Sequence, residues 1–194
     1  MMKQRIAAHI QRSIDAKTAI LNDADFVANL EQAATLCAHA LQQGKKILFA
    51  GNGGSASDAQ HLAAELVGRY KHDRPSLAAI ALTTDTSALT AIGNDYGYEE
   101  VFARQLAGLG QEGDVFVAIS TSGNSKNVLK ACDQAKEKGV SIIGMSGPGG
   151  KLKEESAICF AVPAPETATI QEAHIMIGHI LCDLIEQQIY PTNA

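Results

Sequence analysis

Two short loops rich in glycine and serine constrain this chain most, because each lies between an apolar run and a helix-like run. The first loop, residues 51–55 (GNGGS), follows the apolar run 46–50. The second loop, residues 120–125 (STSGNS), follows the apolar run 115–119. Glycine permits tight turns, and the free N–H groups at the start of the next helix attract anions. A chain that builds this arrangement twice is expected to hold a phosphorylated small molecule.

Apolar runs and helical patterns alternate along the chain from residue 45 onward. The apolar runs predict strands at 46–50, 78–82, 114–119, 140–145 and 157–162. The helical patterns predict helices at 55–70, 85–92, 98–109, 125–138 and 167–188. Such alternation is typical of a parallel sheet with helices on both faces. We therefore expect an α/β fold with a five-stranded parallel sheet, in a single domain over residues 1–194.

Two amphipathic helices are predicted within residues 1–44, ahead of the α/β core at 45–194. Ile6, Ile10 and Ile14 recur every four residues and form one apolar stripe on the first helix. The second helix ends at Gly44, a common residue just beyond a helix terminus. These helices either cover the sheet or pair with other copies of the chain. We favour a role in oligomerisation.

Composition and charge narrow the class of protein. The 194 residues suit one full-sized core, and 46% apolar residues with 19% charged residues are typical of a globular protein. The net charge of −5 disfavours nucleic acid as the main partner, since phosphate contacts need clustered Lys and Arg. No apolar run reaches the ~20 residues of a membrane span, and no signal-peptide pattern opens the chain. The following cysteines lack C-x-x-C spacing, and we expect buried thiols in a reducing, cytoplasmic setting: Cys37, Cys132, Cys159 and Cys182.

The first loop differs from the known nucleotide-binding loops. It lacks the lysine of a P-loop and the G-x-G-x-x-G spacing of a dinucleotide fingerprint, so nucleotide binding is disfavoured. Ligands of open parallel sheets bind at the carboxyl ends of the strands, where this loop lies. The alternative is a tight strand-to-helix turn in which Ser55 is the N-cap of the helix.

The second loop carries four hydroxyl groups within six residues, on Ser120, Thr121, Ser122 and Ser125. Their O–H groups can donate to a phosphate, and the dipole of the following helix adds partial positive charge. Serine, glycine and asparagine are also ordinary turn residues. Four hydroxyls where a strand ends and a helix begins exceed what a turn needs, and they favour phosphate binding.

A histidine–glutamate pair and a second histidine suggest chemistry. His61 and Glu65 are four residues apart and so share one helical face, a spacing that suits a metal or an acid–base pair but also a solvated ion pair. On the last helix, Glu172 falls within about 20° of His179, whereas Gln171 lies about 80° away. Spacing alone therefore favours Glu172 as the partner of His179. It leaves open that His179 is a core histidine.

Taken together, these stretches resemble the sugar isomerase (SIS) family and, within it, the bacterial phosphoheptose isomerases. The matching stretches are GNGGS (51–55), DAQHLAAELVGRY (58–70), RP (74–75), GND (93–95), STSGNS (120–125) and IQEAHIMIGH (170–179). The resemblance covers nearly all of the chain. It implies a flavodoxin-like SIS fold and a homotetramer with sites at the subunit interfaces.

The resemblance also implies the residues of the site. Glu65 and His179 are the implied acid and base, and one zinc ion per subunit is the implied cofactor. The implied zinc ligands are His61, Glu65, Gln171 and His179. The implied substrate contacts are Asn52, Gly53, Gly54, Ser55, Glu65, Arg69, Asn94, Asp95, Ser120, Thr121, Ser122, Ser125 and Gln171. This set takes Gln171 in place of Glu172, and we follow it because ligands from two helices need not share one stripe.

The implied reaction is an aldose–ketose isomerisation. Sedoheptulose 7-phosphate becomes D-glycero-D-manno-heptose 7-phosphate through an enediol, the first step toward ADP-heptose precursors of lipopolysaccharide or capsule. One group must take a proton from carbon and another must serve the carbonyl oxygen, roles that suit a carboxylate and an imidazole.

Three alternatives stay open. A non-catalytic SIS protein that binds the bacterial replication initiator would share the two loops but lack the catalytic carboxylate, so Glu65 together with His179 favours the enzyme. The chain length of the sugar is less constrained than its phosphate, so another phosphosugar is a second alternative. A phosphosugar-sensing regulator usually carries a DNA-reading module, and no basic helix-turn-helix segment is found here.

Overall fold

The central element of the computed structural model, which describes residues 1–191, is one five-stranded parallel sheet. Its strand order is β2-β1-β3-β4-β5. The strands are β1 (Ile47–Ala50), β2 (Ala79–Ala81), β3 (Val115–Ser120), β4 (Ser141–Ser146) and β5 (Ile158–Ala161). This is the doubly wound, flavodoxin-like order, and it confirms the predicted fold class. The predicted domain range ends at 194, and its last three residues lie outside the described part.

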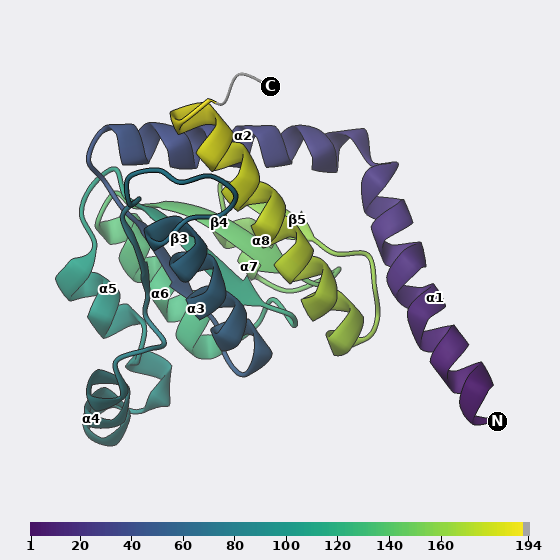
Figure 1. Cartoon of the computed structure of the whole chain (residues 1–194). Coiled ribbons are helices and arrows are strands. Elements are labelled where there is room, and N and C mark those ends of the chain that lie inside the picture. Colours follow the sequence, from purple (N-terminus) through teal and green to yellow (C-terminus); the bar gives the residue numbers. More distant parts are fainter. Residues whose placement is uncertain (192–194) are drawn as a thin grey trace.

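Helices cover both faces of this sheet (Figure 1). The helices of the described chain are α1 (Met2–Leu21), α2 (Ala24–Gln42), α3 (Gly54–Val67), α4 (Thr86–Tyr96), the 3-10 helix η1 (Tyr98–Glu100), α5 (Ala103–Leu109), α6 (Lys126–Glu137), α7 (Leu152–Glu155) and α8 (Thr167–Ile189). The predicted helix at 98–109 is wrong in detail, because it splits into η1 and α5. The predicted helix at 85–92 continues to Tyr96, where Gly97 with φ of 91° ends it.

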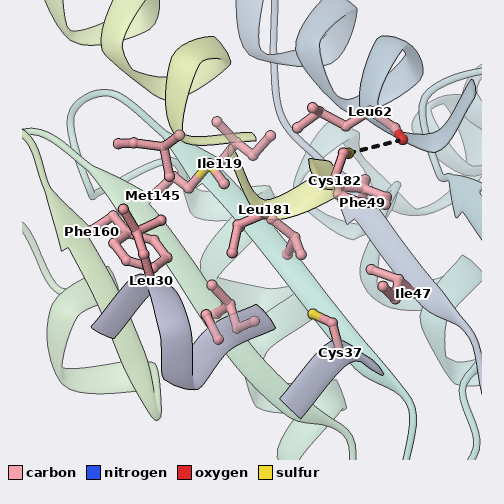
Figure 2. Close-up of a cluster of buried hydrophobic side chains, with 14 of the residues drawn as sticks. Leu30, Cys37, Ile47, Phe49, Leu62, Ile119, Met145, Phe160, Leu181 and Cys182 are labelled. Atoms are coloured by element: carbon pink, nitrogen blue, oxygen red, sulfur yellow. Dashed lines mark hydrogen bonds between the residues drawn. The ribbon is translucent and has the colours of Figure 1, made fainter. Parts of the chain in front are cut away.

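Two apolar clusters fill the space between the sheet and its helices. On one face, α2, α3 and α8 pack against side chains such as Phe49 and Phe160, which Figure 2 shows with Leu30 and Leu181. On the other face, α5, α6 and α7 pack against side chains such as Phe116. Burying one such side chain contributes about 1.5–3 kcal/mol. Strands β1 and β3 are buried along their whole length, as a sheet covered on both faces requires.

The contact between α3 and α8 is unusually close at one position. A Cβ atom added to Gly178 on α8 would lie 2.5 Å from the side chain of Leu62 on α3. Real side chains do not approach this closely, so glycine is what lets the two helices meet here. The neighbours of these two residues, His61 and His179, are thereby brought into contact, with their rings at an interplanar angle of 74°.

The N-terminal helices divide the two roles expected of them. Helix α2 covers the sheet through buried residues such as Phe26 and Leu30. Helix α1 lies at the edge of the fold beside α8 (Figure 1), and its stripe of Ile6, Ile10 and Ile14 is 56%, 54% and 49% exposed. The stripe therefore does not cover the sheet of its own chain. Its use in oligomerisation stays a prediction.

The cysteines are all free thiols. Three of them are buried as predicted, and Cys159 is half-buried. Burial raises the pKa of Cys37 and of Cys132 to about 12, so these thiols stay protonated and unreactive at neutral pH. In the described part of the chain, no helix has both the length and the apolar character that crossing a bilayer requires.

Candidate active site

The hydroxyl-rich loop at 120–125 forms a compact cluster where β3 ends and α6 begins. The Oγ atom of Ser120 donates to Ser125 Oγ at 2.9 Å and lies 3.4 Å from Ser122 Oγ. The backbone N–H of Asn124 donates to Ser122 Oγ at 3.1 Å. Ser125 is the N-cap residue of α6, yet its side chain makes no cap bond, because its hydroxyl faces Ser120. The hydroxyls and the N-terminus of α6 therefore point to one place, which suits an anion.

A neighbouring segment holds this loop in shape. Gly123 has a φ of 65°, and a Cβ atom there would lie 2.4 Å from the carbonyl oxygen of Gly149. The N–H of Gly147 donates to the Thr121 carbonyl, and the N–H of Leu152 donates to the Gly123 carbonyl, both at 3.0 Å. In the structure, this segment is the support of the hydroxyl loop.

The first loop turns the chain from β1 into α3. Gly53, with a φ of 58°, is the N-cap residue, so the reading of Ser55 as the N-cap is wrong. Ser55 is buried in the first turn, and a Cβ atom at Gly51 would lie 2.8 Å from its carbonyl oxygen. Asn52 and Asn127 exchange two amide hydrogen bonds of 2.8 Å each, which ties this loop to α6. Asn127 gave no signal in the sequence.

Two cavities open beside Asn52, at the carboxyl ends of the strands. One has a volume of about 390 Å³ and is lined by Asn52, Gly54, Ser55, Thr121, Thr167, Ala168 and Gln171. The other has a volume of about 480 Å³ and is lined by Asn52, Tyr98, Glu99, Ser125, Lys126 and Asn127. Five residues expected to contact substrate from both loops and α8 thus share the first cavity, which is large enough for a small phosphorylated ligand.

A second group of functional side chains lies where α3 meets α8. His61 Nε2 is 3.1 Å from Glu65 Oε1 and 2.9 Å from His179 Nε2, although 118 residues separate the two histidines. The imidazole of His179 also stacks on the ring of Tyr70, with 5.9 Å between centroids. His61, Glu65 and His179 together form the histidine–glutamate cluster. The reading of His179 as an ordinary core histidine does not describe this arrangement.

The histidine–glutamate cluster has a donor set that suits zinc. One ligand atom of each residue lies within 4.8 Å of the others. Atoms bound to zinc at about 2.0–2.2 Å in a tetrahedral site lie roughly 3.3–3.6 Å apart, a little more than the 2.9 and 3.1 Å found here. Two imidazole nitrogens facing each other also need a proton or a cation between them. The residues present therefore fit the implied metal.

Gln171 lies beside this cluster, held by a residue that sequence analysis did not single out. Its Nε2 atom donates to both carboxylate oxygens of Asp58, at 2.7 and 2.9 Å. With its N–H₂ group turned to Asp58, the amide oxygen has no hydrogen-bond partner among residues 1–191 and can serve a ligand or a metal. Burial raises the pKa of Asp58, while the bond from Gln171 and the positive potential of His61 and His179 oppose this.

The spacing argument for Glu172 is wrong. Its carboxylate lies 3.4 Å from His9 Nε2 on α1 and faces away from α3. Adjacent residues on a helix differ by about 100° in direction, so only one of Gln171 and Glu172 can face α3. His174 is structural: it is buried, and its Nε2 lies 3.0 Å from the Ser146 carbonyl oxygen.

Three predicted substrate contacts lie outside this arrangement. Asn94 and Asp95 are exposed on α4, where the amide of Asn94 donates to the Asp95 carboxylate at 2.8 Å. Arg69 is exposed just beyond α3. None of the three lines either of the two cavities described above. Within one described chain, the structure does not bring them to the other predicted residues.

Comparison with known proteins places this geometry in a class. Residues 12–147 match the SIS domain family. A phosphoheptose isomerase of Aneurinibacillus thermoaerophilus is 55% identical over 97% of this chain and 96% of its own length. One from Sulfurimonas denitrificans is 51% identical over 97% of both chains. The solved phosphoheptose isomerase structure from Neisseria gonorrhoeae has a TM-score of 0.90 and 48% identity, covering 96% of this chain and all of that one.

The fold and these matches define an SIS-domain protein. At this identity over nearly the whole length, the chain belongs to the phosphoheptose isomerases of that family, and it is an isomerase.

Proposed function

We propose that this isomerase converts sedoheptulose 7-phosphate to D-glycero-D-manno-heptose 7-phosphate. Its similarity to phosphoheptose isomerases supports a sugar phosphate as the substrate. The observation that carries the proposal is the convergence of His61, Glu65 and His179 from two helices, beside a cavity that reaches Thr121 of the hydroxyl loop. A phosphate held at one end of that cavity leaves the reacting end of the sugar to the histidine–glutamate cluster.

The proposed residues divide the work by position. The hydroxyls of Ser120, Ser122 and Ser125, with the N-terminus of α6, bind the phosphate and orient the sugar. Glu65 and His179 form the acid–base pair that moves a proton between adjacent carbons through an enediol. Gln171, oriented by Asp58, offers its amide oxygen to the same place. Binding energy from the distant phosphate thereby positions the carbons that react.

We propose one zinc ion per subunit, held by His61, Glu65, Gln171 and His179. A bound zinc ion supplies Lewis-acid polarisation of the carbonyl oxygen. The support is the donor set of the histidine–glutamate cluster and the orientation of the Gln171 amide.

We also propose a homotetramer that completes the site. The exposed isoleucine stripe on α1 provides an apolar surface for other copies, and Asn94, Asp95 and Arg69 are then contributed across subunit interfaces. Light scattering is expected to give about four times the 20.4 kDa chain mass, and Ile10→Asp is expected to lower it. A monomeric wild-type chain with full activity would contradict this assembly.

The remaining proposals concern the setting of the reaction. The free, inert thiols support a cytoplasmic location, where thiols stay reduced. The product would be the first precursor of ADP-heptose for lipopolysaccharide or capsule.

A substrate panel tests the proposed function. The purified chain, supplied with zinc, is given phosphosugars of five, six and seven carbons at equal concentration, and aldose–ketose conversion is followed by NMR. We expect the highest kcat/KM with sedoheptulose 7-phosphate. Preference for a shorter phosphosugar would overturn the substrate. No turnover of any phosphosugar would instead favour the non-catalytic partner of the replication initiator.

A further inference from the structure

A buried ion pair lies just beyond the histidine–glutamate cluster and takes no part in the chemistry proposed above. Arg74 Nε donates to Glu186 Oε2 at 2.9 Å, and the two side chains are only 2% and 1% exposed. Glu186 follows His179 on α8 by about two helical turns. Arg74 lies in the segment 68–76 that follows α3. The pair therefore joins the end of α3 to α8.

The carboxylate of Glu186 binds the backbone of the segment that follows α3. It accepts the backbone N–H groups of Tyr70 at 3.0 Å, of Lys71 at 2.8 Å and of His72 at 3.0 Å, besides the Arg74 guanidinium. Burial would raise the pKa of Glu186, but these donors outweigh it and hold the pKa below its usual value. Three successive N–H groups fixed on one carboxylate define the path of this backbone.

The guanidinium of Arg74 reaches the end of α3 itself. Its Nη2 donates to the carbonyl oxygen of Glu65 at 2.9 Å, and its Nη1 donates to that of Leu66 at 2.7 Å. A cation on the last carbonyls of a helix satisfies acceptors that have no partner within the helix and complements the helix dipole. The arginine thus caps α3 at the turn that carries Glu65.

The same network reaches His179 from the other side. Tyr70, whose N–H is fixed by Glu186, stacks its ring on the His179 imidazole. One ion pair therefore determines the position of the Glu65 backbone on α3 and of the ring that supports His179 on α8. In the sequence, Tyr70 ends the stretch DAQHLAAELVGRY and Arg74 begins RP, and the proposed chemistry gives neither residue a role.

We propose that Arg74 and Glu186 are positioning residues, which hold Glu65 and His179 at the separation that their shared chemistry needs. The expected effect on catalysis rests on the proposed function. The expected effect on the positions of Glu65 and His179 applies to the metal-free chain as well. Residues that support metal ligands from behind typically change metal affinity or activity 10- to 100-fold when they are replaced.

The test uses Glu186→Gln and Arg74→Lys in the full chain, with Asp114→Asn as a matched control. Asp114 is a buried carboxylate that pairs with Lys46 and accepts the backbone N–H groups of Lys46 and Gln111, but it lies at the opposite end of the strands from the site. Its replacement should destabilise the chain without altering the histidine–glutamate cluster. Arg74→Lys keeps the positive charge but loses the several N–H donors of the guanidinium. It is the variant to use if Glu186→Gln does not fold.

Three readouts are measured on folded protein: imidazole NMR signals of the metal-free chain, zinc affinity by competition with a chelator, and kcat with KM. In both Glu186→Gln and Arg74→Lys we expect the His61 and His179 signals to shift. Zinc affinity and kcat should each be lower by about 10- to 100-fold, and KM should stay within about threefold of wild type. Asp114→Asn should leave all three unchanged. Imidazole signals and zinc affinity like those of Asp114→Asn would overturn the proposal. A wild-type chain without turnover contradicts only the proposed function, because the NMR comparison still decides the positioning role.

Discussion

The hydroxyl loop and the histidine–glutamate cluster are built in opposite ways. The loop is six consecutive residues whose serine hydroxyls contact one another, and its shape is set within the stretch 120–125 and the neighbouring segment at 147–152. The cluster joins residues 118 positions apart and exists only where α3 packs against α8. A binding site for a common group such as phosphate can be local. Two groups that must act on one proton need a rigid tertiary contact.

This difference predicts that the two regions fail differently. Damage to the cluster should reduce the chemical step and leave phosphate binding intact, because the loop does not depend on the α3–α8 contact. Damage to the loop should weaken substrate binding and leave the cluster in place. The predictions below separate the two, from the largest expected effect to the smallest.

Replacing a member of the proposed acid–base pair should have the largest effect. Glu65→Gln and His179→Gln are each expected to lower kcat by about 10²–10⁴-fold, because each removes a proton-transfer group while preserving its shape. Steady-state kinetics with sedoheptulose 7-phosphate measures this. The matched control is Glu172→Gln, an amide substitution on α8 that faces α1. Turnover near that of the wild type in either cluster variant would refute that residue's role.

Removing the metal should also impair the histidine–glutamate cluster and not the hydroxyl loop. Dialysis against a chelator is expected to reduce kcat by about 10²-fold or more, because Lewis-acid polarisation supplies several kcal/mol. Zinc should restore it. Binding of inorganic phosphate, measured by calorimetry, should change by less than about twofold. Full activity of a chain shown by elemental analysis to be metal-free would contradict the proposed cofactor.

Removing one hydroxyl from the loop should weaken substrate binding and leave the histidine–glutamate cluster in place. Ser122→Ala is expected to raise KM by about 10- to 100-fold with a smaller change in kcat, since a hydrogen bond to a charged group contributes about 1.5–3 kcal/mol. Thr35→Val, which removes a surface hydroxyl on α2, is the control and should leave KM unchanged. A kcat loss larger than the change in KM would place Ser122 in the chemical step.

His174 has the smallest expected effect on activity, because its titration acts on stability alone. Burial lowers its pKa to about 4, against about 6.5 when unfolded, so the unfolded chain binds the proton first as the pH falls. Its contribution is complete above about pH 6.5 and is lost toward pH 4, a difference of about 3 kcal/mol. Urea unfolding of wild type and His174→Gln from pH 7 to pH 4 measures this. The wild-type curve should fall more steeply, and parallel curves would contradict the assigned pKa.

Sequence reasoning succeeded where a feature is local. The alternation of apolar runs and helices predicted the sheet, and the loops at 51–55 and 120–125 lie at the carboxyl ends of β1 and β3 as expected. The direct choice of Glu172 failed, because spacing on one helix does not say which side faces its neighbour. Asp58, Asn127 and Glu186 went unnoticed, since single polar residues acquire a role only when another element brings them a partner.

The resemblance to a family supplied what spacing could not. Its implied set contains Gln171, which the structure places beside α3 through Asp58. The catalytic, substrate and metal roles of that set stay predictions. Asn94 and Asp95 lie on an exposed helix, and one chain does not bring them to the other predicted substrate contacts. Their predicted role therefore requires the proposed assembly.

Isotope transfer from solvent tests the central claim most directly. Sedoheptulose 7-phosphate is converted in D₂O by the zinc-supplied wild-type chain, and the product is read by NMR. We predict aldose phosphate that carries deuterium at the carbon next to its carbonyl, with both conversion and exchange lost in Glu65→Gln and His179→Gln. Product that forms at the wild-type rate in both variants would contradict proton transfer by this pair.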